Sequence, residues 1–169
     1  MATKRRLLAV ATIAALIGCC KVPKLLDDSP VETLPASSPG EQVFKMDFPC
    51  ENNSDLRIRQ IVLSPTETRI YLRYHNSRSS SVSVSTAPPG QADTFFLEAG
   101  DQHRHVQLRA ATGISIGPKR QKLHVGDEVN FALIFPPIDV GWSPIDLHEG
   151  EIKKEGTTYW NFTDVPLKN

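Results

Sequence analysis

The chain has 169 residues with 19 basic and 19 acidic side chains, so its formal net charge is zero. That balance indicates neither a nucleic-acid partner nor a general polyanion partner, which are typical of strongly basic chains. The length is sufficient for one domain with its own hydrophobic core.

The first 18 residues have the pattern of an export signal. Residues 4–6 are basic, and the eleven residues 7–17 are apolar apart from Thr12. Such a run is typical of a signal peptide and well short of the roughly 20 residues of a membrane-spanning helix. We therefore predict a signal peptide over residues 1–18, whose removal leaves 16 basic and 19 acidic side chains.

The apolar run closes on Leu16-Ile17-Gly18-Cys19. This tetrapeptide resembles the lipobox of bacterial lipoproteins, in which the cysteine thiol receives diacylglycerol and becomes the first residue of the mature chain. The resemblance implies lipidation of Cys19, and at least two acyl chains make an anchor effectively permanent. The alternative is a plain secretory signal with a chance cysteine, or a start codon placed too early.

The residue after the anchored cysteine bears on location. In lipoproteins of enteric-type bacteria, aspartate at that position favours retention in the inner membrane. Here the position holds Cys20. The resemblance therefore implies a lipid-anchored protein of the cell envelope, placed at the outer membrane.

A proline- and serine-rich stretch follows the anchor. Four prolines and three serines fall between residues 21 and 41, with few large apolar side chains. Such a stretch cannot bury enough surface to offset the entropy lost on ordering it, and its prolines keep it semi-extended. We predict a lipidated tether over residues 19–41 and a folded domain over residues 42–169.

Beyond the tether, apolar and polar residues alternate with period two, and helical periodicity is nearly absent. The apolar runs are Ile70-Leu72-Tyr74, Val82-Val84, Val106-Leu108-Ala110, Val129-Phe131-Leu133-Phe135 and Trp160-Phe162. Turn-forming Gly, Pro and Asn residues separate them. Roughly eight or nine short strands of this kind predict an all-β antiparallel β-sandwich, with a closed antiparallel β-barrel as the alternative. We expect Phe131, Leu133 and Phe135 to face the core, near Trp160.

The order of segments 61–63, 68–76 and 126–136 is similar to that of immunoglobulin-like modules in small bacterial envelope proteins. In those modules a strand and an Asn turn are followed by a Gly-Asp or Gly-Glu hairpin, an apolar strand and a proline. The likeness covers roughly residues 56–167 and implies a binding or interaction module. The Cys…Trp…Cys signature of antibody domains is missing, so "immunoglobulin-like" describes the architecture alone.

Two local patterns bear on catalysis and metal binding. On a strand, His103 and His105 share a face, but a metal ion would need further ligands from another strand. Asp146 and His148 could form an acid–base pair, but no serine stands in a nucleophile motif. We therefore predict that the protein is not an enzyme and has no catalytic residues, cofactor or metal site.

Cys20 and Cys50 remain once Cys19 is lipidated, and an oxidising compartment makes them a possible disulfide. The bond would close a loop of about 30 residues and contribute on the order of 3–4 kcal/mol. It would also fold the tether back against the domain. The favoured alternative is an incidental Cys20 and a Cys50 that acts as a small buried apolar residue.

Charge is segregated along the chain: residues 57–122 hold ten basic and four acidic side chains, and residues 123–169 hold three basic and eight acidic ones. Several arginines of the middle block fall on polar strand faces and suggest a possible binding face, namely Arg69, Arg73, Arg104 and Arg109. Arginine binds carboxylate and phosphate groups well. The alternative is that the acidic C-terminal block pairs with these arginines and cancels their charge.

The predicted function is that of a membrane-anchored envelope lipoprotein that acts as a non-catalytic binding or interaction module. Its partners would be the membrane, through the N-terminal lipid, and an envelope protein or anionic polymer. One alternative is an accessory subunit or inhibitor of a secreted enzyme or secretion machine. Another is a small hydrolase or metal-binding protein. Fold class alone does not choose among them.

Overall fold

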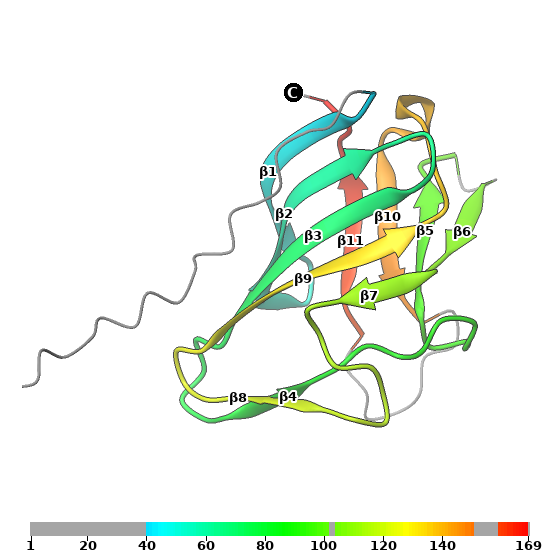
Figure 1. Cartoon of the computed structure of the whole chain (residues 1–169). Helices are drawn as coiled ribbons and strands as arrows, with labels where there is room; N and C mark the ends of the chain where they lie inside the picture. Colours follow the sequence, from blue (N-terminus) through cyan, green and yellow to red (C-terminus); the bar gives the residue numbers. More distant parts are fainter. Residues whose placement is uncertain (1–39, 102–103, 151–158, 169) are drawn as a thin grey trace, which may run out of the picture. The chain divides into compact units, whose positions relative to one another are not determined.

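The computed structural model describes residues 40–101, 104–150 and 159–168, and these residues are all-β (Figure 1). The strands are β1 (Gln42–Cys50), β2 (Asn53–Leu63), β3 (Thr68–His75), β4 (Val82–Val84), β5 (Phe95–Ala99), β6 (His105–Gln107), β7 (Ala110–Thr112), β8 (Gln121–Leu123), β9 (Glu128–Phe135), β10 (Ile145–Glu149) and β11 (Asn161–Val165). A 3-10 turn, η1 (Val140–Trp142), precedes β10. None of the described residues belongs to a helix with the length and hydrophobicity that a bilayer crossing requires.

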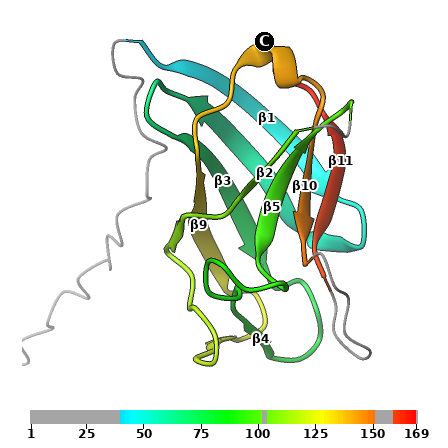
Figure 2. The ribbon, with the colours of Figure 1, turned by 90° about the vertical axis from the view of Figure 1, so that its right-hand side faces the viewer.

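Two antiparallel sheets form a β-sandwich of immunoglobulin-like architecture. The five-stranded sheet has the order β1-β2-β3-β9-β7 and the four-stranded sheet the order β11-β10-β5-β6. Figure 2 shows β3 and β9 in one layer and β5 and β10 in the other. Over the described ranges each sheet keeps two edge strands, so neither closes on itself. The predicted sandwich is therefore confirmed, and the alternative of a closed barrel is wrong.

The apolar stripe of β9 faces the space between the sheets, as predicted. Phe131, Leu133 and Phe135 are 3%, 0% and 0% exposed. The ring of Trp160 lies 6.2 Å from that of Phe131, centroid to centroid. Fully buried side chains of the opposite sheet complete this core, among them Leu97, Leu147 and Phe162. A slip of one residue would turn the whole stripe to solvent, so its burial confirms the predicted register.

The alternating run from Val106 to Ala110 is not one strand, as its period suggested, but two strands in different sheets. The Leu108 N–H donates to the carbonyl oxygen of Phe95 (3.0 Å) in the four-stranded sheet. The next residue, Arg109, donates its N–H to Ile134 (2.8 Å) in the five-stranded sheet. The chain thus passes from β6 to β7 across the edge of the sandwich. Val106 and Leu108 pack toward the core as the alternation predicts, but in β7 the residue that packs against the core is Ala111.

Residues 1–39 lie outside the described part of the chain. The signal peptide over 1–18, the lipidation of Cys19, the role of Cys20 and nearly all of the tether therefore stay predictions. The first strand begins at Gln42.

Candidate functional site

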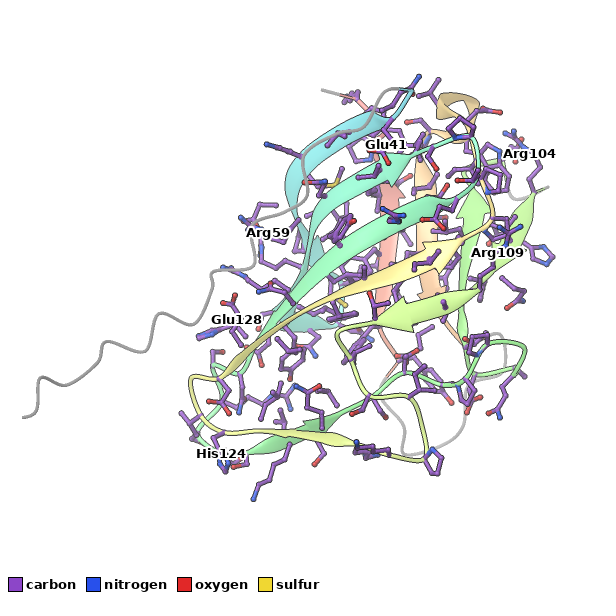
Figure 3. All side chains as sticks on the ribbon, in the orientation of Figure 1. Glu41, Arg59, Arg104, Arg109, His124 and Glu128 are labelled. Carbon is purple, nitrogen blue, oxygen red and sulfur yellow. The ribbon has the colours of Figure 1, made fainter. Side chains whose placement is uncertain are left out.

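One end of the sandwich carries a pocket of about 660 Å³. Strand β4 and the loop after it form one side, and Asn53, Tyr74 and Glu149 line the other. Figure 3 places His124, which follows β8, at this end of the domain, and Glu41, which precedes β1, at the opposite end. The volume lies within the range of about 300–1,000 Å³ that is typical of small-molecule sites. We therefore take this pocket as the candidate binding site.

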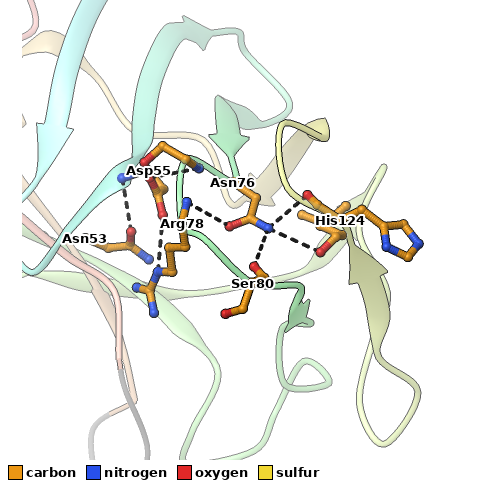
Figure 4. A network of polar contacts seen from close by, with 8 residues as sticks. Asn53, Asp55, Asn76, Arg78, Ser80 and His124 are labelled. Carbon is orange, nitrogen blue, oxygen red and sulfur yellow. Dashed lines mark hydrogen bonds and ion pairs between the residues drawn. The ribbon is translucent and has the colours of Figure 1, made fainter.

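The ribbon formed by β4 and β8 is held against the sandwich by Asn76, which follows β3 (Figure 4). The Asn76 side chain is fully buried, and its Nδ2 donates to the carbonyl oxygens of Ser80 (3.0 Å), Leu123 (3.3 Å) and His124 (2.9 Å). Its main-chain N–H donates to the carbonyl oxygen of Asp127 (2.9 Å). One buried amide therefore ties the loop before β4 and the end of β8 to the sheet, which fixes the pocket wall.

A second polar cluster places Arg78 at the pocket (Figure 4). The buried carboxylate of Asp55 accepts a hydrogen bond from the Ser77 hydroxyl and one from Arg78 Nε (3.3 Å). Burial acts to raise the pKa of Asp55, but the hydrogen bonds from Ser77 and Arg78 outweigh it and hold that pKa below its usual range. Because Asp55 neutralises Arg78, this arginine adds little free positive charge to the pocket.

Glu149, the last residue of β10, brings a carboxyl group to the pocket. Its side chain is buried, and its Oε2 accepts a hydrogen bond from the Trp160 N–H (3.1 Å). Burial raises the pKa of Glu149 to about 8. The hydrogen bond from the Trp160 N–H acts to lower this pKa, and the charge of Asp93 acts to raise it further. At neutral pH this carboxyl group is mainly protonated, so it can donate a hydrogen bond to a ligand.

Three exposed cations lie close together at the start of β8, namely Lys119, Arg120 and Lys122. Arg120 lines the pocket, and Lys122 pairs in register with Ser83, which also lines it. Among the described residues none of the three takes part in an ion pair. Residues 79–92 and 113–126, which form the ribbon and its loops, contain no Asp or Glu. The rim of the pocket is therefore basic, whereas its interior holds a protonated carboxyl group.

The four arginines predicted as a possible binding face do not share one sheet face. Arg69 and Arg73 both project from β3 on the outer face of the five-stranded sheet, because Ile70 and Leu72 between them face the core. Arg104 precedes β6 in the other sheet and Arg109 stands between β6 and β7, as Figure 3 shows. The structure thus brings together one pair of the four.

Each of these arginines is bound by a neighbour. The partners are Glu67 for Arg69, Glu128 for Arg73 (3.7 Å), Asp101 for Arg104 (3.3 Å) and the main-chain oxygen of Thr66 for Arg109 (3.3 Å). The Arg104 guanidinium also stacks over the ring of Trp142, 5.0 Å from its centroid. Ion pairs at the surface add little stability, but they do reduce the positive field that a ligand would meet.

Carboxylates of the acidic C-terminal block, residues 123–169, accept hydrogen bonds from main-chain N–H groups as well as pairing with one of these arginines. Glu128 belongs to this block and pairs with Arg73. Asp139 instead accepts the Gly141 N–H at the start of η1 (2.7 Å), and Asp146 accepts the Asp164 N–H (2.7 Å). Asp139 therefore stabilises a local turn and Asp146 links β10 to β11, and neither is paired with one of the four arginines.

Cys50 ends β1 and is buried, and within the described residues it forms no disulfide. Its Sγ donates to Asn52 Oδ1 (3.1 Å), and burial raises the pKa of the thiol. The proposed disulfide partner, Cys20, lies outside the described residues, so that pairing stays a prediction.

The residues weighed for metal binding and catalysis contact ordinary structural neighbours. His103 lies outside the described residues, and the ring of His105 packs edge-on against Phe96, 6.5 Å between centroids. His148 Nδ1 is 3.3 Å from Asn161 Oδ1. In the part of the chain that the structure describes, no group of three or more His, Cys, Asp or Glu side chains is placed to hold a metal ion.

The sequence reasoning did not single out the pocket, the buried Glu149 or the cations of the ribbon. A signal for the cations was present, because Lys119-Arg120-Gln121-Lys122 lies within a stretch that has no acidic residue. The burial of Glu149 left no such local signal. Comparison of the chain with models of protein families, with curated proteins and with solved structures finds no match.

Proposed function

We propose that the protein is a lipid-anchored lipoprotein of the cell envelope, located at the outer membrane, and that its β-sandwich is a non-catalytic binding module. The observation that carries the binding role is the pocket at the ribbon end, with its polar lining and basic rim. Convergent polar groups in a concave site, together with one perturbed carboxyl group, mark a candidate ligand site.

The position of the pocket supports this role. The folded domain begins at Gln42, which pairs with Leu63 at one end of the five-stranded sheet. The ribbon lies beyond the other end, where His75 pairs with Glu128. The pocket therefore lies at the end of the domain opposite the start of β1, so attachment to a membrane through the N-terminal side would leave it accessible to other components of the envelope. The expected partner is an envelope protein or an anionic polymer.

Site-specific photocrosslinking tests the binding role in the native envelope. A photoreactive amino acid with a short aliphatic diazirine side chain, small enough to leave the pocket open, replaces Ser85 in the pocket lining, and a matched variant carries it at exposed Thr66 in the β2–β3 turn. We expect illumination to shift the mobility of the full-length Ser85 variant on denaturing gels and to leave the Thr66 variant unshifted. Equal adducts at both positions, or none at Ser85, would contradict a binding site at the pocket.

The anchor is tested by Cys19→Ala. We expect this variant to lose labelling with palmitate and to accumulate as uncleaved precursor or as a soluble product, because the thiol that receives diacylglycerol is gone. Metabolic labelling and partitioning into a detergent phase measure the change, with Cys50→Ala as the matched control that keeps the anchor. Unchanged labelling of the Cys19→Ala protein would show that the lipobox interpretation is wrong.

A further inference from the structure

We propose that the pocket binds an anionic polysaccharide, with one sugar unit inside the pocket and the carboxylate or phosphate group of the polymer at the basic rim. The inference rests on the proposed binding function and names the ligand class for the same site. The partner of the pocket is a glycan, and the polymers compared below distinguish it from a protein and from a purely electrostatic partner.

The interior of the pocket suits a neutral group rich in hydroxyls. Ser83, Ser85 and Thr86 line the wall that β4 and the following residues provide. On the opposite side, Asn53 Oδ1 accepts the Asp55 N–H (3.1 Å), which leaves its amide nitrogen as a donor. Sugar hydroxyls both donate and accept hydrogen bonds, so they match hydroxyl and amide groups better than an apolar or purely anionic group does.

The buried carboxyl group of Glu149 also favours a neutral sugar inside the pocket, with the anionic group of the ligand outside it. When protonated it both donates and accepts a hydrogen bond, which pairs it well with a sugar hydroxyl. An anionic group placed beside it would also lie near Asp93, which lines the same pocket. Like charges in a partly desolvated site repel strongly, so the anionic part of the ligand belongs elsewhere.

The rim provides the place for the anionic group. Arg120 lines the mouth, and Lys122 stands on β8 opposite Ser83 of β4. Both side chains are exposed and outside any ion pair among the described residues, so their charge is available to a ligand. By contrast, Arg69 and Arg73 on the outer sheet face are paired with Glu67 and Glu128. A polymer with repeated anionic groups gains from several such contacts at once.

The experiment compares four polymers with the full-length protein in detergent, by biolayer interferometry. Polygalacturonate carries carboxylates on sugars, dextran phosphate carries phosphates on sugars, dextran is an uncharged glycan, and polyglutamate is anionic without hydroxyls. We expect at least one of the first two to bind, and dextran and polyglutamate to bind at least about tenfold more weakly. The two anionic arms distinguish carboxylate from phosphate as the preferred group.

Two matched double variants, each of which removes two positive charges, locate the site. Arg120→Gln with Lys122→Gln should raise the Kd by at least about tenfold, because each lost contact is a charge-assisted hydrogen bond. Arg69→Gln with Arg73→Gln should change it by less than about twofold, since both side chains already have partners. A Ser85→Trp variant, which fills the pocket, should weaken binding as strongly as the rim variant, and thermal unfolding confirms that each variant is folded.

Several outcomes would overturn the inference. Polyglutamate binding as tight as that of the polysaccharides would show a plain basic surface, and equal losses in the two double variants would show a diffuse field rather than a site. Absence of binding to both anionic polymers would also overturn it. The proposed binding function is judged separately by crosslinking from Ser85, which does not depend on the ligand class.

Discussion

Replacing Phe131 with alanine is expected to destabilise the domain by about 3–5 kcal/mol, the usual cost of truncating a buried aromatic residue. Phe131 is 3% exposed and packs against Trp160, 6.2 Å between ring centroids, so the substitution removes apolar contacts and leaves a cavity between the sheets. Urea unfolding followed by tryptophan fluorescence gives the change in the free energy of unfolding.

The matched control for this experiment is Ile134→Ala, on the same strand. Ile134 is half-buried and projects from the opposite face of β9, so its truncation should cost clearly less. A loss below about 1 kcal/mol for Phe131→Ala would mean that the stripe does not form the core. A larger loss for Ile134→Ala would mean that the two faces of β9 are reversed.

Glu149→Gln is expected to change how the stability of the domain depends on pH. The pKa of Glu149 is about 8 in the folded state, above its ordinary value of 4.5, so the folded state holds a proton that the unfolded chain releases. Its contribution is fully present below about pH 4.5 and is lost as pH rises through about 8. The loss is on the order of 5 kcal/mol over this window.

Thermal unfolding midpoints at several pH values test this expectation. The wild-type midpoint should fall between about pH 4.5 and 8, and the fall should be much smaller in Glu149→Gln, whose amide keeps an acceptor for the Trp160 N–H. Asp93, Arg78 and Arg120 are the other charged residues that line the pocket, and they are unchanged in the variant. Glu128→Gln, which makes the same chemical change at an exposed position on β9, is the control. Parallel profiles for wild type and Glu149→Gln would show that other groups cause the pH dependence.

The fold class was readable from the sequence because strand periodicity is local. Phe131, Leu133 and Phe135 alternate with polar or smaller residues, and a strand places successive side chains on opposite faces wherever it lies in the domain. The same rule could not divide the run from Val106 to Ala110 between two sheets, because alternation does not say which strand a segment pairs with.

The candidate site depended on tertiary structure. Arg73 is neutralised by Glu128, which stands far along the chain and is brought near by the pairing of β3 with β9. Lys122 keeps its charge free because β8 pairs with β4, a strand without charged residues. In the sequence, Glu149 is one of eight acidic residues between residues 123 and 169. Only the tertiary structure shows that it is buried beside Trp160 and Asp93. Alternation is a property of neighbours in the chain, whereas burial and the neutralisation of charge depend on which distant segments meet.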